Sequence, residues 1–153
     1  MSVGPSKEDL TLIVDTILQN KGTAVYTLRD SDTLADAVAM LNGHNIGAVV
    51  IVGPDDTVAG ILSERDIVRQ LGKNPGTALA QTIGSCMTRS VVTCERTTAI
   101  GDVMERMTRR RIRHMPVVEN DRLLGIISIG DVVKLKIEEV EHEAEVLREY
   151  IAS

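Results

Sequence analysis

The chain of 153 residues has almost no aromatic side chains: Phe and Trp are absent, and Tyr26 and Tyr150 are the only tyrosines. Its hydrophobic residues, 43% of the total, must therefore build a core from Val, Ile, Leu, Met and Ala. That fraction is ordinary for a globular protein. The length allows one domain or two very small ones.

Long apolar runs and an excess of positive charge are also missing. No apolar stretch approaches the roughly 18 residues of a membrane-spanning helix, and the N-terminus has no signal-peptide pattern. We therefore expect a cytoplasmic protein. The net charge of −5 argues against broad binding to nucleic acids or anionic membranes, so we expect neither as a partner.

Cysteine and histidine are too few for most metal and redox chemistry. Cys86 and Cys94 are the only cysteines; we expect them to be reduced and partly buried, with a redox role as the less favoured alternative. With the scattered His44, His114 and His142 they do not match the ligand spacing of a zinc site. No nucleophile–base arrangement, metal cluster or Walker loop is recognisable. We therefore predict no enzymatic activity and no catalytic cofactor.

What the sequence does contain is an internal repeat. Residues 25–68 align with residues 91–133, with one gap in the turn of the second copy. The matched landmarks are Thr27 and Thr93, Asp36 and Asp102, Ile46 and Ile112, Val52 and Val118, Gly60 and Gly125, Ile61 and Ile126, Ser63 and Ser128, and Asp66 and Asp131. Chance does not keep so many landmarks in register, so the pattern predicts a tandem duplication.

Each copy has the pattern of a β-α-β-β-α unit. A short strand (residues 25–28 or 91–94) precedes apolar residues at helical spacing, two apolar strands follow around a turn, and Ser-x-x-Asp opens a closing helix. We predict the fold class α/β (α+β), with repeat one over residues 15–72 and repeat two over residues 81–136. The Gly- and Pro-containing residues 72–76 form the linker.

Two further helices are expected to flank the repeats. Leu10, Val14, Ile17 and Leu18 have the spacing of an N-terminal amphipathic helix. A C-terminal acidic helix is predicted over residues 137–153. Its apolar residues recur at alternating spacings of four and three: Val133, Ile137, Val140, Ala144, Leu147 and Ile151. This heptad pattern fits either a helix packed on its own domain or a homodimer contact, and both interpretations stay open.

Two Ser-x-x-Asp motifs, Ser63/Asp66 and Ser128/Asp131, stand where an apolar strand meets a helix. The simplest interpretation is a capping box, in which hydroxyl and carboxylate satisfy free amides at the helix start. The alternative is a ligand site, because ligands bind at the carboxyl ends of strands in α/β sheets and helix N-termini attract anions. Amides and a hydroxyl suit a phosphate, and a carboxylate suits ribose hydroxyls. The motifs therefore favour a nucleotide.

The repeat, with RIRHMPVV at residues 111–118 and GIISIGDVV at residues 125–133, resembles the CBS domain family (cystathionine-β-synthase-type domains). The resemblance implies a stand-alone CBS pair, or Bateman module. Such pairs form a compact disc with pseudo-two-fold symmetry and two clefts that commonly bind adenine nucleotides, and many are homodimers. The implied ligand is AMP first, with ADP, ATP or NAD(H) as alternatives.

The resemblance also implies a role for each motif residue. Asp66 and Asp131 would hold ribose hydroxyls, and Ser63 and Ser128 would contact phosphate. The further residues implied for the two clefts are Ile46, Gly47 and Ala48, expected at the Asp131 cleft; Ile112, Arg113, His114 and Met115, expected at the Asp66 cleft; Arg65, inside the first motif; and, as weaker candidates, Lys21 and Ser85.

The two copies depart from each other in their basic residues. Gly47 and Ala48 stand where the second copy has Arg113 and His114. We therefore expect different ligands, or only one filled cleft, with the weaker or different ligand at Asp66. For Arg106, Arg109, Arg110 and Arg111 a solvated helix end that complements the helix dipole is the simpler interpretation. Arg113 enters the strand, and Arg suits phosphate oxygens.

Three functions follow in order of preference. The first is a regulatory adenine-nucleotide-binding protein that senses energy or redox state and acts on an unidentified protein partner. The second is a protein-interaction scaffold that acts through the C-terminal helix, with ligand binding secondary. The third, a small phosphohydrolase, would need metal-binding carboxylates or an activated nucleophile.

Overall fold

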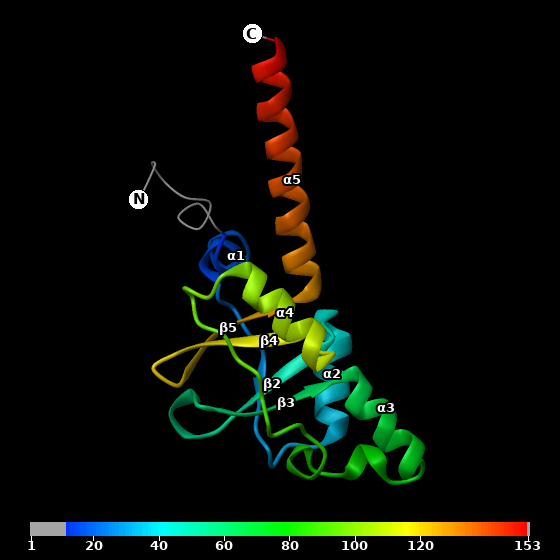
Figure 1. Cartoon of the computed structure of the whole chain (residues 1–153). Helices are drawn as coiled ribbons and strands as arrows, with labels where there is room; N and C mark the ends of the chain where they lie inside the picture. The colour runs from blue at the N-terminus through cyan, green and yellow to red at the C-terminus, as the bar shows by residue number, and fades with distance from the viewer. Residues whose placement is uncertain (1–11, 153) are drawn as a thin grey trace.

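The computed structural model describes residues 12–152, which form two α/β repeats and a long terminal helix (Figure 1). The helices and strands, in chain order, are α1 (Val14–Lys21), β1 (Thr27–Leu28), α2 (Leu34–His44), β2 (Ala48–Val52), β3 (Val58–Ser63), α3 (Glu64–Lys73), α4 (Ile100–Arg110), β4 (His114–Glu119), β5 (Arg122–Ser128) and α5 (Ile129–Ala152). The predicted mixed fold with tandem repeats is confirmed. Leu10, assigned to the first helix, lies outside the described residues.

The first repeat has a three-stranded sheet of order β1-β2-β3, and the second has β4 paired with β5. The strand predicted over residues 91–94 is wrong: the segment makes only an isolated parallel bridge between Cys94 and Val117. Pro116 explains the difference. Its counterpart in the first repeat, Val50, pairs with Thr27 in the parallel ladder, whereas proline has no N–H to donate there.

The core of each repeat includes residues from the segment that comes before the strands of the other repeat. Val14, Ile17 and Leu18 of α1 pack into the core of the second repeat. Ile83 and Met87, which follow the first repeat, pack into the core of the first. The two halves therefore cannot be cut apart without exposing apolar surface from both cores.

Backbone hydrogen bonds also join the two repeats. Ile61 on β3 and Thr88 exchange backbone hydrogen bonds of 3.0 Å in both directions. Thr57, between β2 and β3, and Arg122, at the start of β5, form an isolated antiparallel bridge. These contacts hold the two sheets together, so that each strand-to-helix junction faces residues from the other half.

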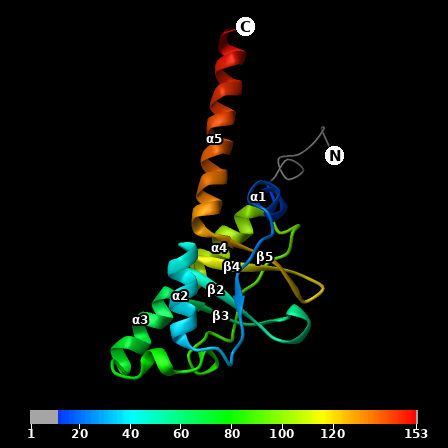
Figure 2. The same cartoon turned by 180° about the vertical axis from the view of Figure 1, so that it is seen from behind.

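The closing helix of the second repeat and the predicted C-terminal acidic helix are one element, α5. Only Val132 and Leu135, in its first turns, are buried. Beyond them α5 extends away from the body of the molecule (Figures 1 and 2). Among residues 12–152, no helix is long and apolar enough to span a bilayer.

Candidate functional site

Both Ser-x-x-Asp motifs are capping boxes. Ser63 N donates to Asp66 Oδ2 at 2.9 Å, and Asp66 N donates to Ser63 Oγ at 3.4 Å. Ser128 N donates to Asp131 Oδ2 at 2.8 Å, and Asp131 N donates to Ser128 Oγ at 3.2 Å. Thr33 caps α2 in the same way. Capping therefore accounts for the motif's spacing and leaves open whether Asp66 and Asp131 have a second role.

A cleft of about 760 Å³, here called the Asp66 cleft, lies against the N-terminus of α3. Ser63, Asp66 and Arg65 line it from the first repeat, and Arg113 and His114 line it from the second. Its volume falls within the range of small-molecule sites, about 300–1,000 Å³. It is a cleft between the two repeats, built at a strand-to-helix junction.

The Asp66 cleft is basic although the whole chain is acidic. Its charged lining residues are the arginines Arg65, Arg69, Arg110, Arg111 and Arg113, and the carboxylates Glu64 and Asp66. The arginines come from α3, from the last residue of α4 and from the segment that joins α4 to β4. In a protein of net charge −5, such a concentration attracts anions, and planar guanidinium groups suit phosphate oxygens.

Part of the lining is apolar. Ala48 and Ile61 come from β2 and β3 of the first repeat, and Ile112 comes from the second repeat. An apolar wall beside charged groups is the usual composition of a small-molecule site, where it receives the flat or hydrophobic part of the ligand. The cleft thus offers apolar, anion-binding and hydroxyl-binding surfaces together.

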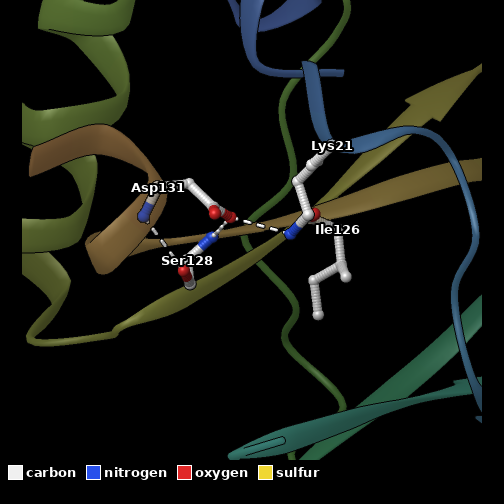
Figure 3. A network of polar contacts seen from close by, with 4 residues as sticks. All are labelled: Lys21, Ile126, Ser128 and Asp131. Carbon is white, nitrogen blue, oxygen red and sulfur yellow. Dashed lines mark hydrogen bonds and ion pairs between the residues drawn. The ribbon is translucent and has the colours of Figure 1, made fainter. Parts of the chain in front are cut away.

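The second candidate cleft is smaller and its carboxylate is already engaged. It has a volume of about 440 Å³ and is lined by residues of α1 and α5, among them Lys21, Asp131, Lys134 and Glu138. Lys21 Nζ lies 2.8 Å from Asp131 Oδ2 and donates to the carbonyl oxygen of Ile126 at 3.1 Å (Figure 3). Burial acts to raise the pKa of Asp131, but the hydrogen bonds from Lys21 and Ser128 outweigh it and hold this pKa below its usual value.

His114 lies between the two clefts. It lines the Asp66 cleft, and its ring is so close to Gly47 that a Cβ there would lie 3.1 Å from His114 Cε1. Burial lowers its pKa; Glu64 and Asp131 act in the opposite direction, whereas Lys21 acts with burial. The pKa of His114 therefore depends on charged groups at both clefts.

The predicted division of residues between the clefts is partly wrong. Ile112, Arg113 and His114 line the Asp66 cleft as expected, but Gly47 and Ala48 line it too and are not among the residues of the Asp131 cleft. The pairing of Ala48 with Ser63 and the bond of 3.1 Å from Glu64 N to the carbonyl of Gly47 explain this. They hold the start of β2 against the cap of its own repeat.

Three of the remaining candidates do not line either of these two clefts. The Met115 side chain is fully buried in the core of the second repeat, and Ile46 packs against the core of the first. Ser85 donates through Oγ to the carbonyl of Thr82 at 2.7 Å on the surface. Lys21, by contrast, lies at the centre of the Asp131 cleft.

The sequence did not point to Arg69, and for Arg110 and Arg111 it favoured a solvated helix end. Arg110 and Arg111 line the Asp66 cleft, whereas Arg109 is paired with Glu105 and Arg106 donates to the carbonyl of Thr93. The spacing of four between Arg65 and Arg69 places both on one face of α3. That spacing was the available signal.

Metal and thiol chemistry gain no support from the described residues. In that part of the chain, no three His, Cys, Asp or Glu side chains gather as they would around a metal ion. Cys94 is buried, and burial raises the pKa of its thiol to about 12, so it stays a protonated, unreactive thiol at neutral pH.

Comparison with known proteins agrees with the resemblance of the repeats. A family model described as CBS domain matches the chain twice, at residues 22–73 and 83–138. The mitochondrial CBS domain-containing protein CBSX3 of Arabidopsis thaliana is 36% identical over 124 residues, which cover 78% of this chain and 60% of that protein. Hypoxic response protein 1 of Mycobacterium tuberculosis is 32% identical over 113 residues, which cover 72% of this chain and 77% of that protein. The chain thus spans less than two thirds of the first relative.

Solved structures give the same result for the fold. A CBS-domain-containing protein from Agrobacterium tumefaciens superimposes with a TM-score of 0.79 at 42% identity, covering 82% of this chain and 99% of that one. The CBS domain pair of protein MJ0100, solved with 5′-methylthioadenosine and S-adenosyl-L-methionine, gives a TM-score of 0.76 at 27% identity, covering 84% and 98%.

Proposed function

The chain belongs to the CBS domain family as a tandem pair, and on this premise we propose that it is a non-catalytic regulatory module that binds an adenine nucleotide in the Asp66 cleft. The observation that carries the proposal is the convergence of five arginines from both repeats on the N-terminus of α3. The two adenosine-type ligands of the MJ0100 domain pair support the adenosine part of the ligand.

Each part of a nucleotide has a matching surface in this cleft. Ala48, Ile61 and Ile112 offer an apolar wall for the base, and Asp66 offers a carboxylate for the ribose hydroxyls. The arginines would hold the phosphates, aided by the dipole of α3. Because five guanidinium groups exceed the charge of one phosphate, we place ADP and ATP ahead of AMP. NAD(H) stays an alternative because it carries two phosphates.

The proposal reverses the expected ranking of the clefts. The Asp131 carboxylate is bound by Lys21, so a ribose would have to displace that ammonium group. The position equivalent to Lys21 before the second repeat is Met87, and Met87 is packed into the core of the first repeat. The Asp66 carboxylate thus has no counterpart of Lys21 among the described residues, and we assign the stronger site to it.

Calorimetric titration separates this proposal from adenosine recognition without charge. ATP and ADP are expected to bind more tightly than AMP. 5′-Methylthioadenosine and S-adenosyl-L-methionine, which lack phosphate, are expected to bind at least tenfold more weakly than ADP. The loss of one charge-assisted hydrogen bond would cause a difference of that size. Guanine and pyrimidine nucleotides are the specificity controls. Equal affinity for ADP and 5′-methylthioadenosine would contradict a role for the arginines.

Asp36 provides a matched control for Asp66. Both are the third residue of a helix and both accept the backbone N–H of their cap. Asp66→Ala and Asp36→Ala should each cost about 0.5–2 kcal/mol of stability. Only Asp66→Ala should also weaken ADP binding, by roughly tenfold to more than a hundredfold. If both variants bind ADP as the unmodified protein does, Asp66 is only a cap.

The second candidate function is a protein-interaction scaffold that acts through α5, favoured by the exposed apolar residues of that helix. Absence of binding by every adenine nucleotide would favour this function over sensing. We include a homodimer in both candidates. A cytoplasmic location and an unidentified regulated partner stay predictions from the sequence.

A further inference from the structure

The outer face of α5 carries an apolar stripe, here the α5 stripe, that the body of the protein does not cover. Its members are Val133, Ile137, Val140, Ala144, Leu147 and Ile151. Ile137, Val140, Leu147 and Ile151 are between 52% and 73% exposed. Val132 and Leu135, which α5 does bury in the core, lie on a different face. Packing on its own domain therefore does not explain the stripe.

The charged residues beside the stripe indicate what covers it. When Ile137, Ala144 and Ile151 are taken as the a positions of a heptad, Val133, Val140 and Leu147 are the d positions. The g positions then hold Lys136, Glu143 and Tyr150, and the e positions hold Lys134, Glu141 and Arg148. In a parallel coiled coil each g residue faces the e residue five places later in the partner. Those pairs are Lys136 with Glu141 and Glu143 with Arg148, and both are attractive.

An antiparallel pair that overlaps along the whole stripe would instead bring like charges together. It would place Glu141 opposite Glu141, Glu143 opposite Glu143, and Lys134 opposite Arg148. Sliding the helices by one heptad brings Lys134 opposite Glu141 and Lys136 opposite Glu143, which attract, but leaves two of the six apolar positions of each helix unpaired. The parallel arrangement is therefore the one that combines attractive charge pairs with the pairing of all six apolar positions.

We propose that the α5 stripe binds the α5 stripe of a second copy as a parallel two-stranded coiled coil. This inference specifies the contact of the proposed homodimer and does not depend on the nucleotide. Fewer than three heptads make a marginal coil by themselves, so the dimer should dissociate on dilution. Asp131 lies in the first turn of the same helix, so the dimer contact and the Asp131 cleft share one rigid element.

Sedimentation of the full chain over a range of concentrations tests the surface. Val140→Glu places a charge within the stripe and should weaken dimerisation tenfold or more, because the charge would be buried unpaired. Val146→Glu is the matched control: Val146 is on the same helix and 50% exposed, but it lies off the stripe. A monomer at every concentration, or equal effects of the two variants, would overturn the proposal.

A charge exchange tests the orientation. Lys136→Glu alone should weaken the dimer, and Lys136→Glu combined with Glu141→Lys should restore it, because a parallel pair regains opposite charges. In the antiparallel register shifted by one heptad the double variant turns attractive pairs into like-charge pairs, and in the fully overlapping one it leaves position 141 facing its own like charge. A double variant that fails to recover the dimer would therefore overturn the parallel arrangement. ADP titration of Val140→Glu keeps the two proposals apart. No residue of α5 lines the Asp66 cleft, so its ADP affinity should not change even when the dimer is lost.

Discussion

Lys21 and Asp131 are 110 residues apart in the chain and form an ion pair of 2.8 Å between Lys21 Nζ and Asp131 Oδ2 (Figure 3). The pair ties α1, at the start of the described chain, to the first turn of α5. The repeated Ser-x-x-Asp motif makes the two clefts look alike in sequence, but this contact makes them different. The residue equivalent to Lys21 in the segment before the second repeat is Met87, which is buried in the core of the first repeat.

Lys21→Met introduces the residue type of the equivalent position, Met87, and should make the stability of the protein less sensitive to acid. The folded-state pKa of Asp131 is lowered, so the ion pair contributes fully above the usual carboxyl pKa of about 4. Its contribution is lost as the pH falls through the folded-state pKa. The variant should lose up to about 1 kcal/mol at pH 7, and this loss should begin to shrink as the pH falls below about 4.

Urea denaturation at pH 7 and pH 3.5 measures this difference, with Lys73→Met as a control for loss of an exposed lysine. A deficit for Lys21→Met that stays constant from pH 7 to pH 3.5 would mean that the pair with Asp131 is not its source.

Arg111 has a backbone conformation that its residue type disfavours, and replacing it should separate stability from binding. It ends α4 with φ of 54°, in the left-handed region, where a residue with a Cβ other than Asn or Asp costs about 1–2 kcal/mol. The first repeat has Asn45 at the equivalent place, also with φ of 54°. Arg111→Asn should therefore raise the free energy of unfolding by about 0.5–1 kcal/mol and weaken ADP binding.

Thermal denaturation and calorimetry on the same variant check both effects. Unchanged ADP affinity in a stabilised Arg111→Asn protein would remove Arg111 from the binding surface and leave its strained conformation unexplained.

The repeat pattern predicted the fold because both copies carry the same apolar periodicity and the same caps. Ser63, Asp66, Ser128 and Asp131 were found at strand-to-helix junctions for that reason. The exchange of α1 and the 83–87 segment between the cores could not be predicted, because an apolar stripe shows that a helix is buried and does not show against which core.

The composition of the clefts was harder to predict than their position. Arg69, Arg110 and Arg111 gather at the Asp66 cleft because of how the two repeats pack, which no local spacing encodes. The absence of a strand at residues 91–94 could have been predicted from the sequence. Pro116 stands where Val50 pairs with Thr27 in a parallel ladder, and a proline disfavours the equivalent pairing in the second repeat.

Gly60 and Gly125 occupy equivalent positions but should differ in their tolerance of a side chain. A Cβ at Gly60 would lie 2.9 Å from the backbone oxygen of Thr88, and one at Gly125 would lie 3.1 Å from Leu18 Cδ2. A flexible leucine end moves more easily than a paired backbone. We expect Gly60→Ala to cost about 1–3 kcal/mol and Gly125→Ala to cost less than half of that loss. Urea denaturation of the two variants measures both, and equal losses would contradict the close packing of Thr88 on β3.

His114 should make the unliganded protein less stable in mild acid. Burial, the largest effect, lowers the pKa of His114 in the folded state. Its charged neighbours are Glu64 on α3, Lys21 on α1, Asp131 on α5 and Arg113 immediately before β4. The unfolded chain takes up this proton near pH 6.5, whereas the folded protein takes it up only at lower pH. Stability is therefore full above pH 6.5 and falls as the pH drops through the folded-state pKa.

His114→Asn removes that proton, so its stability should fall less between pH 7.5 and pH 5.5 than that of the unmodified protein. His142→Asn, an exposed imidazole on α5, controls for loss of a histidine. Urea denaturation at both pH values, without nucleotide, gives the comparison, since a phosphate in the Asp66 cleft would favour the protonated imidazole and mask the effect. If His114→Asn lost as much stability in acid as the unmodified protein, the pKa of His114 would be the same in the folded and unfolded states, and the prediction would be wrong.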